Sequence, residues 1–248
     1  MEYDNKTILA ANNVSHHTHS VKNFFDKTEN YLDNTFGVKI RTHIVGKLAG
    51  EYQGKRVLDV GCGNGMVTMV LSGNNELVLV DVSDSMISLA RKNYQKYAPQ
   101  SKVTFINQGL DDIRLEGKFD LIVAFGLLAH LENISLTLAK LSSLLSHSGK
   151  LILQFSPAEK LTNKLWLFMA KNKINYKINP VYSSGLSRIV DEVGLSVLQE
   201  ISYGIMVPGV GKLPHNWLCK INMFLLDKKI FKFIHTEKVW LLAKKEPS

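Results

Sequence analysis

Apolar residues gather in five short runs that follow one another through the first two thirds of the chain. Each run is rich in valine, isoleucine and leucine and is nearly continuous; the five occupy 57–60, 77–81, 103–107, 119–124 and 150–155. Continuous runs of this length are typical of strands that are buried on both faces, as in a parallel sheet. Segments with helical spacing separate the runs, so the pattern predicts an α/β fold with helices on both faces of the sheet.

The connecting segments carry signals for the starts and ends of helices. A first crossover helix is expected to begin within 66–72, and Ser83 is a suitable N-cap for the helix that follows the second run. The helix expected over 134–145 should end at the triplet His147-Ser148-Gly149, because glycine commonly follows the last turn of a helix.

The two ends of the chain read differently from this central part. Two helical patterns, 22–32 and 36–48, precede the first run. After Pro157 the pattern predicts a further series of elements: a helix over 164–175, a helix over 182–193 closed by Gly194, a strand over 195–203, a loop over 205–218 followed by a helix, and a last strand over 239–243. Residues 1–20 are polar and are expected to form a flexible arm.

Composition bounds the class of protein. The chain has 248 residues, 45% of them hydrophobic, which suits one ordinary domain and excludes disorder by composition. Two cysteines are too few for a disulfide framework and fit a reducing compartment. The N-terminus has no apolar core of a signal peptide, and the longest apolar run, 121–129, is too short to span a bilayer, so a cytoplasmic protein is expected.

The net charge of +8 favours acidic partners, but the basic residues are spread along the chain. Stable nucleic-acid binding is therefore not expected. Residues 212–248 carry eight lysines against three acids, mixed with large apolar groups. This C-terminal region is compatible with a weak membrane-surface contact, with a pocket for a greasy acceptor, or with an ordinary helix that packs on the core. His16, His17 and His19 lack a carboxylate or cysteine that would complete a metal site, and no metal is expected.

The candidate chemistry lies where the first two apolar runs end. The first run leads into Gly61, Gly63 and Gly65, and the second ends on Asp81, twenty residues after Gly61. Glycines allow a tight turn and let a ligand approach the backbone closely. Unpaired N–H groups at the start of the next helix point at such a ligand. A carboxylate at the end of the next strand is placed to accept hydrogen bonds from ribose hydroxyls.

The glycine spacing distinguishes two classes of nucleoside ligand. Dinucleotide enzymes would have a third glycine at position 66, which is Met66 here. The pattern Asp59-x-Gly61-x-Gly63-x-Gly65 instead resembles motif I of the class I S-adenosylmethionine-dependent methyltransferases. That resemblance, which continues over the next hundred residues, implies a Rossmann-like sheet of seven mostly parallel strands with an antiparallel last strand. It also implies S-adenosyl-L-methionine as the cofactor.

The same resemblance implies which residues contact the cofactor. Phe24-Phe25-Asp26 with Tyr31 looks like the N-terminal helix that covers the cofactor in small-molecule methyltransferases, and Met86 stands where a side chain packs on adenine. The acidic residue that the family has after the third strand falls on Gly109, so Leu110 or Asp111 is the expected substitute. The expected contacts are Tyr31, Asp59, Gly61, Cys62, Gly63, Asp81, Val82, Met86, Gly109, Leu110, Asp111 and Phe125.

The family organisation implies one methyltransferase domain over 21–248, with lid helices in 21–50 and acceptor-pocket insertions at 158–182 and 205–235. Methyl transfer from a sulfonium is an in-line displacement, which depends mainly on positioning. A hydroxyl acceptor also needs a base, and His130, just past the fourth strand, is the candidate, with Tyr182 and His215 as alternatives.

The acceptor is left open by the sequence. The Asn/Asp-Pro-Pro-Tyr/Phe motif of enzymes that methylate exocyclic amines is missing, since the fourth strand leads into Phe125-Gly126-Leu127. A small, apolar or aromatic acceptor is expected, methylated on oxygen rather than on nitrogen or carbon. The alternatives are an RNA-modifying methyltransferase, which the basic charge favours, and a non-catalytic methyltransferase-like binding protein. A nicotinamide dehydrogenase is disfavoured by Met66.

Overall fold

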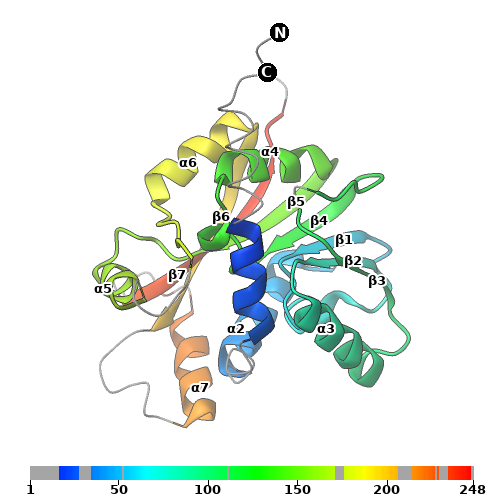
Figure 1. Ribbon diagram of the computed structural model, residues 1–248, viewed down its shortest axis with the longest axis horizontal. Helices are drawn as coiled ribbons and strands as arrows, with labels where there is room; N and C mark the ends of the chain where they lie inside the picture. Colours follow the sequence, from blue (N-terminus) through cyan, green and yellow to red (C-terminus); the bar gives the residue numbers. More distant parts are fainter. Residues whose placement is uncertain are drawn as a thin grey trace.

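A computed structural model describes residues 17–27, 35–51, 53–110, 112–170, 176–205, 214–226, 228 and 234–246. Its centre is a seven-stranded sheet with the strand order β3-β2-β1-β4-β5-β7-β6 (Figure 1). The strands are β1 (Arg56–Val60), β2 (Glu76–Asp81), β3 (Lys102–Asn107), β4 (Phe119–Ala124), β5 (Leu145–Phe155), β6 (Leu195–Ile205) and β7 (His235–Lys244). The first five pair in parallel, and β7 runs antiparallel between β5 and β6. The predicted fold class is confirmed.

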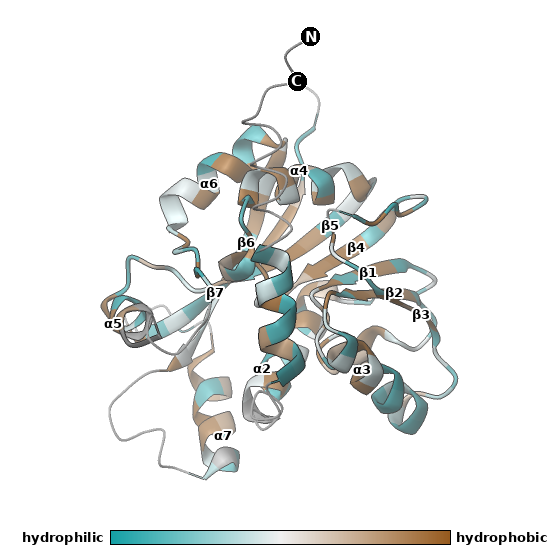
Figure 2. Cartoon of the chain, in the orientation of Figure 1, coloured by the Kyte–Doolittle hydropathy of each residue, from teal (hydrophilic) through white to brown (hydrophobic). Residues whose placement is uncertain are grey.

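Helices cover both faces of this sheet. They are α2 (Thr35–Ala49), α3 (Asp84–Tyr97), α4 (Ile134–Leu144), α5 (Leu161–Ala170), α6 (Ser183–Glu192) and α7 (His215–Leu225), with 3-10 turns η2 (Met69–Leu71) and η3 (Leu128–His130). A further helical segment, 17–27, precedes α2 and lies across the front of the molecule in Figure 1. One buried cluster joins the sheet to α4 and α6, and a second joins it to α2 and α3. Figure 2 shows the hydrophobic strands between these helices.

The connection from β1 to β2 differs from the prediction. A helix was expected within 66–72, but the structure has only the short turn η2 there. Gly61, Gly63 and Gly65 all have positive φ, and they use up the first part of this short connection. The face that a crossover helix would cover is instead filled by α2, whose Ile44 is buried in the same cluster as Leu71.

The end of α4 also differs from the prediction. The helix ends at Leu144, and the chain passes directly into β5 at Leu145, so Gly149 does not terminate a helix. The pairing of β5 with β4 shifts register between Phe119 and Leu121. A Cβ on Gly149 would lie 2.7 Å from the carbonyl oxygen of Phe119. Glycine is therefore required at 149 because two backbones approach closely at this irregularity.

The remaining elements agree in type with the prediction but shift at their ends. The helical segment at the N-terminus begins at 17, inside the predicted arm, and α5 begins three residues earlier than expected. Gly194, with φ of 74°, follows α6 as predicted. Residues 1–16, 28–34, 171–175, 206–213 and 229–233 lie outside the described residues. None of the helices in the described part is long and apolar enough to cross a membrane.

Candidate functional site

The glycine turn after β1 is fixed to the end of β2. The N–H groups of Gly61 and Cys62 both donate to the carbonyl oxygen of Val80, at 2.8 and 3.1 Å. A Cβ on Gly65 would lie 3.0 Å from side-chain atoms of Leu79 and Tyr94, so this glycine allows the turn to pack against α3. Gly63 has open space where a Cβ would stand.

Asp81 links the glycine turn to the start of α3. Its Oδ2 accepts a hydrogen bond from the N–H of Gly63 at 2.8 Å, and its Oδ1 accepts one from the N–H of Ser83 at 2.9 Å. Burial raises the pKa of this carboxyl, while these backbone N–H groups oppose that rise. Each carboxylate oxygen has two acceptor sites, so Asp81 can still accept hydrogen bonds from a ligand.

A cavity of about 830 Å³ opens at the carboxyl ends of β1, β2, β3 and β4. This volume lies in the range of small-molecule and cofactor sites. Its lining includes these predicted cofactor contacts, together with the candidate base His130: Gly61, Gly63, Asp81, Val82, Met86, Gly109, Leu110 and Phe125. The structure thus brings together residues from four strand ends, as open parallel sheets do at their ligand sites.

Two of the predicted contacts do not line the cavity. Asp59 is 3% exposed within β1, and its Oδ2 accepts a hydrogen bond from the hydroxyl of Thr68 at 2.6 Å. Burial raises the pKa of Asp59 to about 7. Cys62 packs its thiol into the core on the α2 and α3 face, and burial raises its pKa well above the usual value. Both residues therefore support the turn from behind. Tyr31 and Asp111 lie outside the described residues.

Asp112 lines the cavity although the sequence does not predict it as a contact. Its N–H donates to the carbonyl oxygen of Gly109 at 3.2 Å, in the turn that follows β3. A Cβ on Gly109 would lie only 3.2 Å from Oδ2 of Asp112. The carboxylate of Asp112 thus occupies the space next to the position where the family has its acidic side chain. The Asp111-Asp112 pair was visible in the sequence, but the direction of the turn was not.

The loop after β4 is held from behind by a polar chain. The N–H of Gly126 donates to Oε1 of Gln154 at 2.6 Å, and Nε2 of Gln154 donates to the carboxylate of Glu237. The hydroxyl of Ser156 donates to the same carboxylate oxygen at 2.7 Å. Burial raises the pKa of Glu237. This chain fixes Phe125 and Gly126 at the cavity wall, and no local sequence signal could connect residues that are 83 positions apart.

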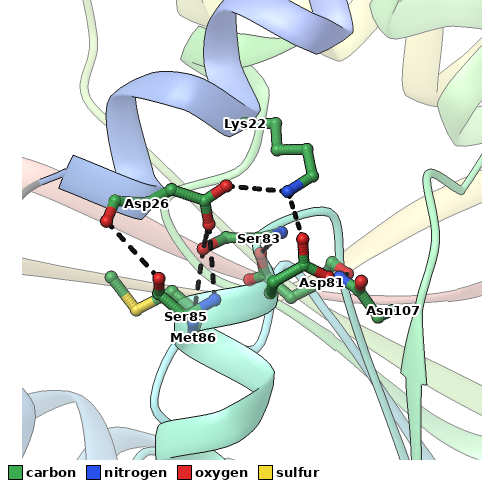
Figure 3. A network of polar contacts seen from close by, with 8 residues as sticks. Lys22, Asp26, Asp81, Ser83, Ser85, Met86 and Asn107 are labelled. Atoms are coloured by element: carbon green, nitrogen blue, oxygen red, sulfur yellow. Dashed lines mark hydrogen bonds and ion pairs between the residues drawn. The ribbon is translucent and has the colours of Figure 1, made fainter.

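The helical segment 17–27 covers the cavity and is attached to α3 by charged groups (Figure 3). Lys22 Nζ lies 2.7 Å from Asp26 Oδ2 and 2.5 Å from Asp84 Oδ2. Asp26 Oδ1 accepts hydrogen bonds from the hydroxyl of Ser83 at 2.5 Å and from the N–H of Ser85 at 3.3 Å. Burial raises the pKa of Asp26, but the hydrogen bonds from Lys22 and Ser83 outweigh it, and the net pKa is lowered. A carboxylate is favourable here because it faces the N-terminus of a helix.

His130, in η3, also lines the cavity. Its Nδ1 is 2.8 Å from the hydroxyl of Tyr176, and its ring meets the ring of Phe25 edge-on at 5.2 Å between centroids. Nε2 of His17 donates to the carbonyl oxygen of His130 at 3.0 Å. Burial, together with the charge of His17, lowers the pKa of His130 to about 4. The imidazole is therefore neutral near pH 7. Tyr182, an alternative candidate, is half exposed and does not line the cavity.

Comparison with known proteins identifies the family. A family model described as a methyltransferase domain matches residues 51–182, which is more than half of the chain. The chain belongs to this methyltransferase family. The predicted membership of the S-adenosylmethionine-dependent class is confirmed.

Curated relatives match a shorter part of this chain than the family model does. A ubiquinone biosynthesis O-methyltransferase from Coxiella burnetii is 34% identical over 104 residues, which are 40% of this chain and 42% of the relative. A tRNA U34 carboxymethyltransferase from Dichelobacter nodosus is 34% identical over 102 residues, which are 41% of this chain and 32% of the relative. The alignments thus span less than half of either relative.

Solved structures show the same fold over most of the chain. Magnesium protoporphyrin IX methyltransferase from Synechocystis, crystallised with S-adenosylhomocysteine, has a TM-score of 0.61 at 20% identity, covering 98% of this chain and all of the other. An S-adenosylmethionine-dependent methyltransferase from Thermotoga maritima has a TM-score of 0.66 at 16% identity, covering 93% of this chain and all of the other. At these identities the likeness concerns the fold.

Proposed function

We propose that this methyltransferase transfers a methyl group from S-adenosylmethionine to the oxygen of a small-molecule acceptor inside the cavity at the strand ends. The observation that carries the proposal is the joint position of Asp81 and Gly63 at that cavity, with a hydrogen bond of 2.8 Å between them. A nucleoside ligand needs a hydroxyl-binding carboxylate and a backbone without side chains beside it, and these two residues supply both.

The lining residues fit the parts of this cofactor. Asp81 would accept hydrogen bonds from the ribose hydroxyls, and the Gly61 and Gly63 backbone would lie along the ligand. Met86 and Leu110 offer apolar surface for the adenine ring, and the carboxylate of Asp112 would accept from its amino group. Phe125, beside Gly126, would contact the methionine part.

The cofactor supplies a methyl group that its sulfonium has already activated. The protein's task is then to hold an acceptor atom in line and to keep water out, and such positioning can be worth roughly 7–11 kcal/mol of the barrier. Segment 17–27 contributes Val21, Lys22 and Phe25 to the cavity wall. With its attachment to α3, this segment excludes water from the reacting atoms.

His130 is proposed to accept the proton when the acceptor is a hydroxyl. It lines the cavity and is neutral, because burial lowers its pKa to about 4. The hydrogen bond to Tyr176 fixes the orientation of the ring. Positioned base assistance contributes roughly 100- to 10,000-fold to such a reaction.

A small and largely apolar acceptor fits the wall near His130, where Phe25, Leu127 and Leu131 line the cavity. The similarity to a ubiquinone biosynthesis O-methyltransferase supports oxygen as the acceptor atom. The similarity to a tRNA carboxymethyltransferase and the net charge of +8 favour RNA as the second candidate. Retention on RNA that weakens steeply with salt would favour that alternative. Two free cysteines support a reducing compartment, the cytoplasm, as the place of action.

Calorimetric titration tests the cofactor assignment. The wild-type protein should bind S-adenosylmethionine and its demethylated product and should not bind NADH. Asp81→Ala should weaken this binding at least tenfold, or about 1.4 kcal/mol, because hydrogen bonds to a charged acceptor are lost. Asp191→Ala, which removes an exposed acid on α6, is the matched control. Unchanged affinity in folded Asp81→Ala would overturn the assignment, and a protein that binds neither ligand would be a non-catalytic relative.

A further inference from the structure

Helix α5 presents an apolar stripe to solvent. Leu161, Leu165 and Phe168 are 82%, 56% and 78% exposed. Their spacing of four and then three residues places them on one face of the helix. The other side of α5 is attached to the fold, because Nδ2 of Asn163 donates to the carbonyl oxygens of Pro157 and Thr236, at 2.9 and 2.8 Å. The exposed stripe is therefore a stable feature of the folded chain.

Helix α7 presents a second stripe of the same kind. Trp217 and Phe224 are 64% and 69% exposed, and Lys220 stands between them on the same face. The ammonium group of Lys228 lies 5.1 Å from the ring centroid of Phe224. The opposite side of α7 is buried at Leu218.

Both helices belong to the same flank of the molecule. α5 follows β5, and α7 follows β6. Both strands run antiparallel to β7, so their carboxyl ends lie at the same end of the sheet. Figure 1 shows α5 and α7 projecting outward at the side of β6 and β7, away from α3 and α4.

We propose that this α5–α7 face, made of Leu161, Leu165, Phe168, Trp217, Lys220 and Phe224, docks on an anionic lipid bilayer. Large apolar groups with interspersed lysines are the composition of helices that lie in a membrane interface. Neither helix contains an acidic residue, and Lys164 adds a further positive charge on α5. Lysine is depleted in protein–protein interfaces, so this composition favours a lipid surface over a protein partner.

Such docking goes beyond the proposed function and does not depend on it. Binding to vesicles is measured without the methyl donor, so its failure is distinct from failure of the cofactor assignment. Docking would bring the enzyme to its acceptor, since an apolar acceptor is concentrated in a bilayer. Each lysine near an anionic surface raises the binding constant roughly fivefold.

The test uses the full chain with vesicles of phosphatidylcholine alone or mixed with phosphatidylglycerol. The chain has three tryptophans, and Trp166→Phe removes one of the two besides Trp217. The other, Trp240, is buried and donates to Glu200, so its emission should not respond to lipid. The emission of Trp217 should then shift to the blue with the anionic vesicles and should be quenched by brominated lipid. Trp217→Ser combined with Phe224→Ser should weaken co-sedimentation at least tenfold. Leu136→Ser removes an equally exposed apolar side chain from α4 and should bind like the wild type.

Charge variants distinguish a contact with anionic lipid from a contact between protein chains. Lys220→Gln should weaken binding to the anionic vesicles roughly fivefold, while Lys92→Gln, on the exposed side of α3, should leave it unchanged. Equal effects of both variants would overturn the proposal, as would absence of vesicle binding by the wild type. A dimer in ultracentrifugation that Phe224→Ser dissociates, without vesicle binding, would instead assign the face to contact between two copies of the chain.

Discussion

At the scale of single residues, the turn after β3 carries its acidic side chain at Asp112 and not at position 109, where the family has one. A side chain at position 109 would compete with the Asp112 carboxylate for the same space, because a Cβ on Gly109 would lie 3.2 Å from Oδ2 of Asp112. Asp112→Ala should therefore weaken binding of S-adenosylmethionine by about tenfold, the effect of losing one hydrogen bond to a charged group. Adding Gly109→Asp to that variant should restore much of the affinity, because the emptied space can hold the new carboxylate.

The same titration calorimetry measures both variants, and Asp191→Asn serves as the control for a lost surface charge. Normal affinity in Asp112→Ala would show that this carboxylate does not contact the cofactor. If Asp112→Ala binds the cofactor weakly and Gly109→Asp does not restore the affinity, Asp112 acts by shaping the backbone turn and not by contacting the cofactor.

The lowered pKa of His130 predicts the pH dependence of the reaction. A base must be unprotonated, and burial lowers the pKa of His130 to about 4 from an ordinary value near 6.5. The acidic limb of kcat/KM should therefore lie near pH 4, and the rate should be constant between about pH 5 and 8 for a hydroxyl acceptor. His130→Ala should lower kcat by roughly 100-fold or more.

The pH–rate profile also tests the partner of this histidine. Tyr176→Phe removes the hydroxyl that lies 2.8 Å from Nδ1 and should lower kcat while the fold is kept. His147→Gln changes an exposed histidine and should leave the profile unchanged. A near-wild-type rate in His130→Ala would show that the acceptor needs no base.

At the scale of elements, the attachment of segment 17–27 to α3 should control release of the cofactor. Asp26 joins the two elements through Ser83 and Ser85, and Lys22 bridges Asp26 and Asp84. Asp26→Asn removes the charge at the N-terminus of α3. The side chain of Asp26 is 23% exposed, so the variant should weaken the attachment of the segment by about 1–2 kcal/mol. The rate of cofactor dissociation should then rise roughly fivefold to thirtyfold.

Stopped-flow measurement of dissociation checks this prediction, and hydrogen exchange in 17–27 should become faster at the same time. Asp191→Asn, which breaks the exposed ion pair with Lys245, is the matched control. If exchange accelerates while dissociation does not, the segment covers the cavity without limiting release.

Elements with a strong local pattern could be predicted from the sequence, and the prediction failed where tertiary contacts decide the structure. The strands β1, β2 and β4 are buried nearly throughout, so their apolar runs are continuous and their positions agree with the structure. The sequence predicts that Gly149 ends a helix, but a glycine is required there because the backbone of Phe119 lies too close for a side chain. The crossover helix was expected from the chain after Gly65, but α2 covers that face.

At the scale of the whole molecule, the site combines parts that no local pattern connects. Gly61, Gly63 and Asp81 could be predicted because the glycine turn and the strand end are local signals. The Asp26–Ser83 contact joins positions 57 apart, and the Gln154–Glu237 contact joins positions 83 apart. Such contacts depend on the order of the strands and on the path of the N-terminal segment, which are properties of the completed fold.

The buried carboxyl of Asp59 makes the stability of the whole fold depend on pH. Its folded pKa is about 7 because of burial, whereas an unfolded aspartate has a pKa of about 3.9. Between these values the folded state binds the proton more tightly. The contribution of Asp59 is therefore fully present below about pH 4 and is lost as the pH rises through 7. A difference of about 3 pH units corresponds to about 4 kcal/mol, and hence to a fall in Tm on the order of 10 °C.

Asp59→Asn should remove this pH dependence, because an amide cannot ionise. Its oxygen can still accept the hydrogen bond from Thr68, which lies 2.6 Å from Oδ2 of Asp59. Calorimetric unfolding of the cofactor-free protein from about pH 4 to 8 should show a smaller fall in Tm for the variant, which becomes more stable than the wild type above about pH 7. Asp191→Asn, which changes an exposed acid, should follow the wild-type curve. Parallel curves for Asp59→Asn and the wild type would mean that Asp59 is ionised in the fold, with its charge balanced by the surrounding groups of the turn.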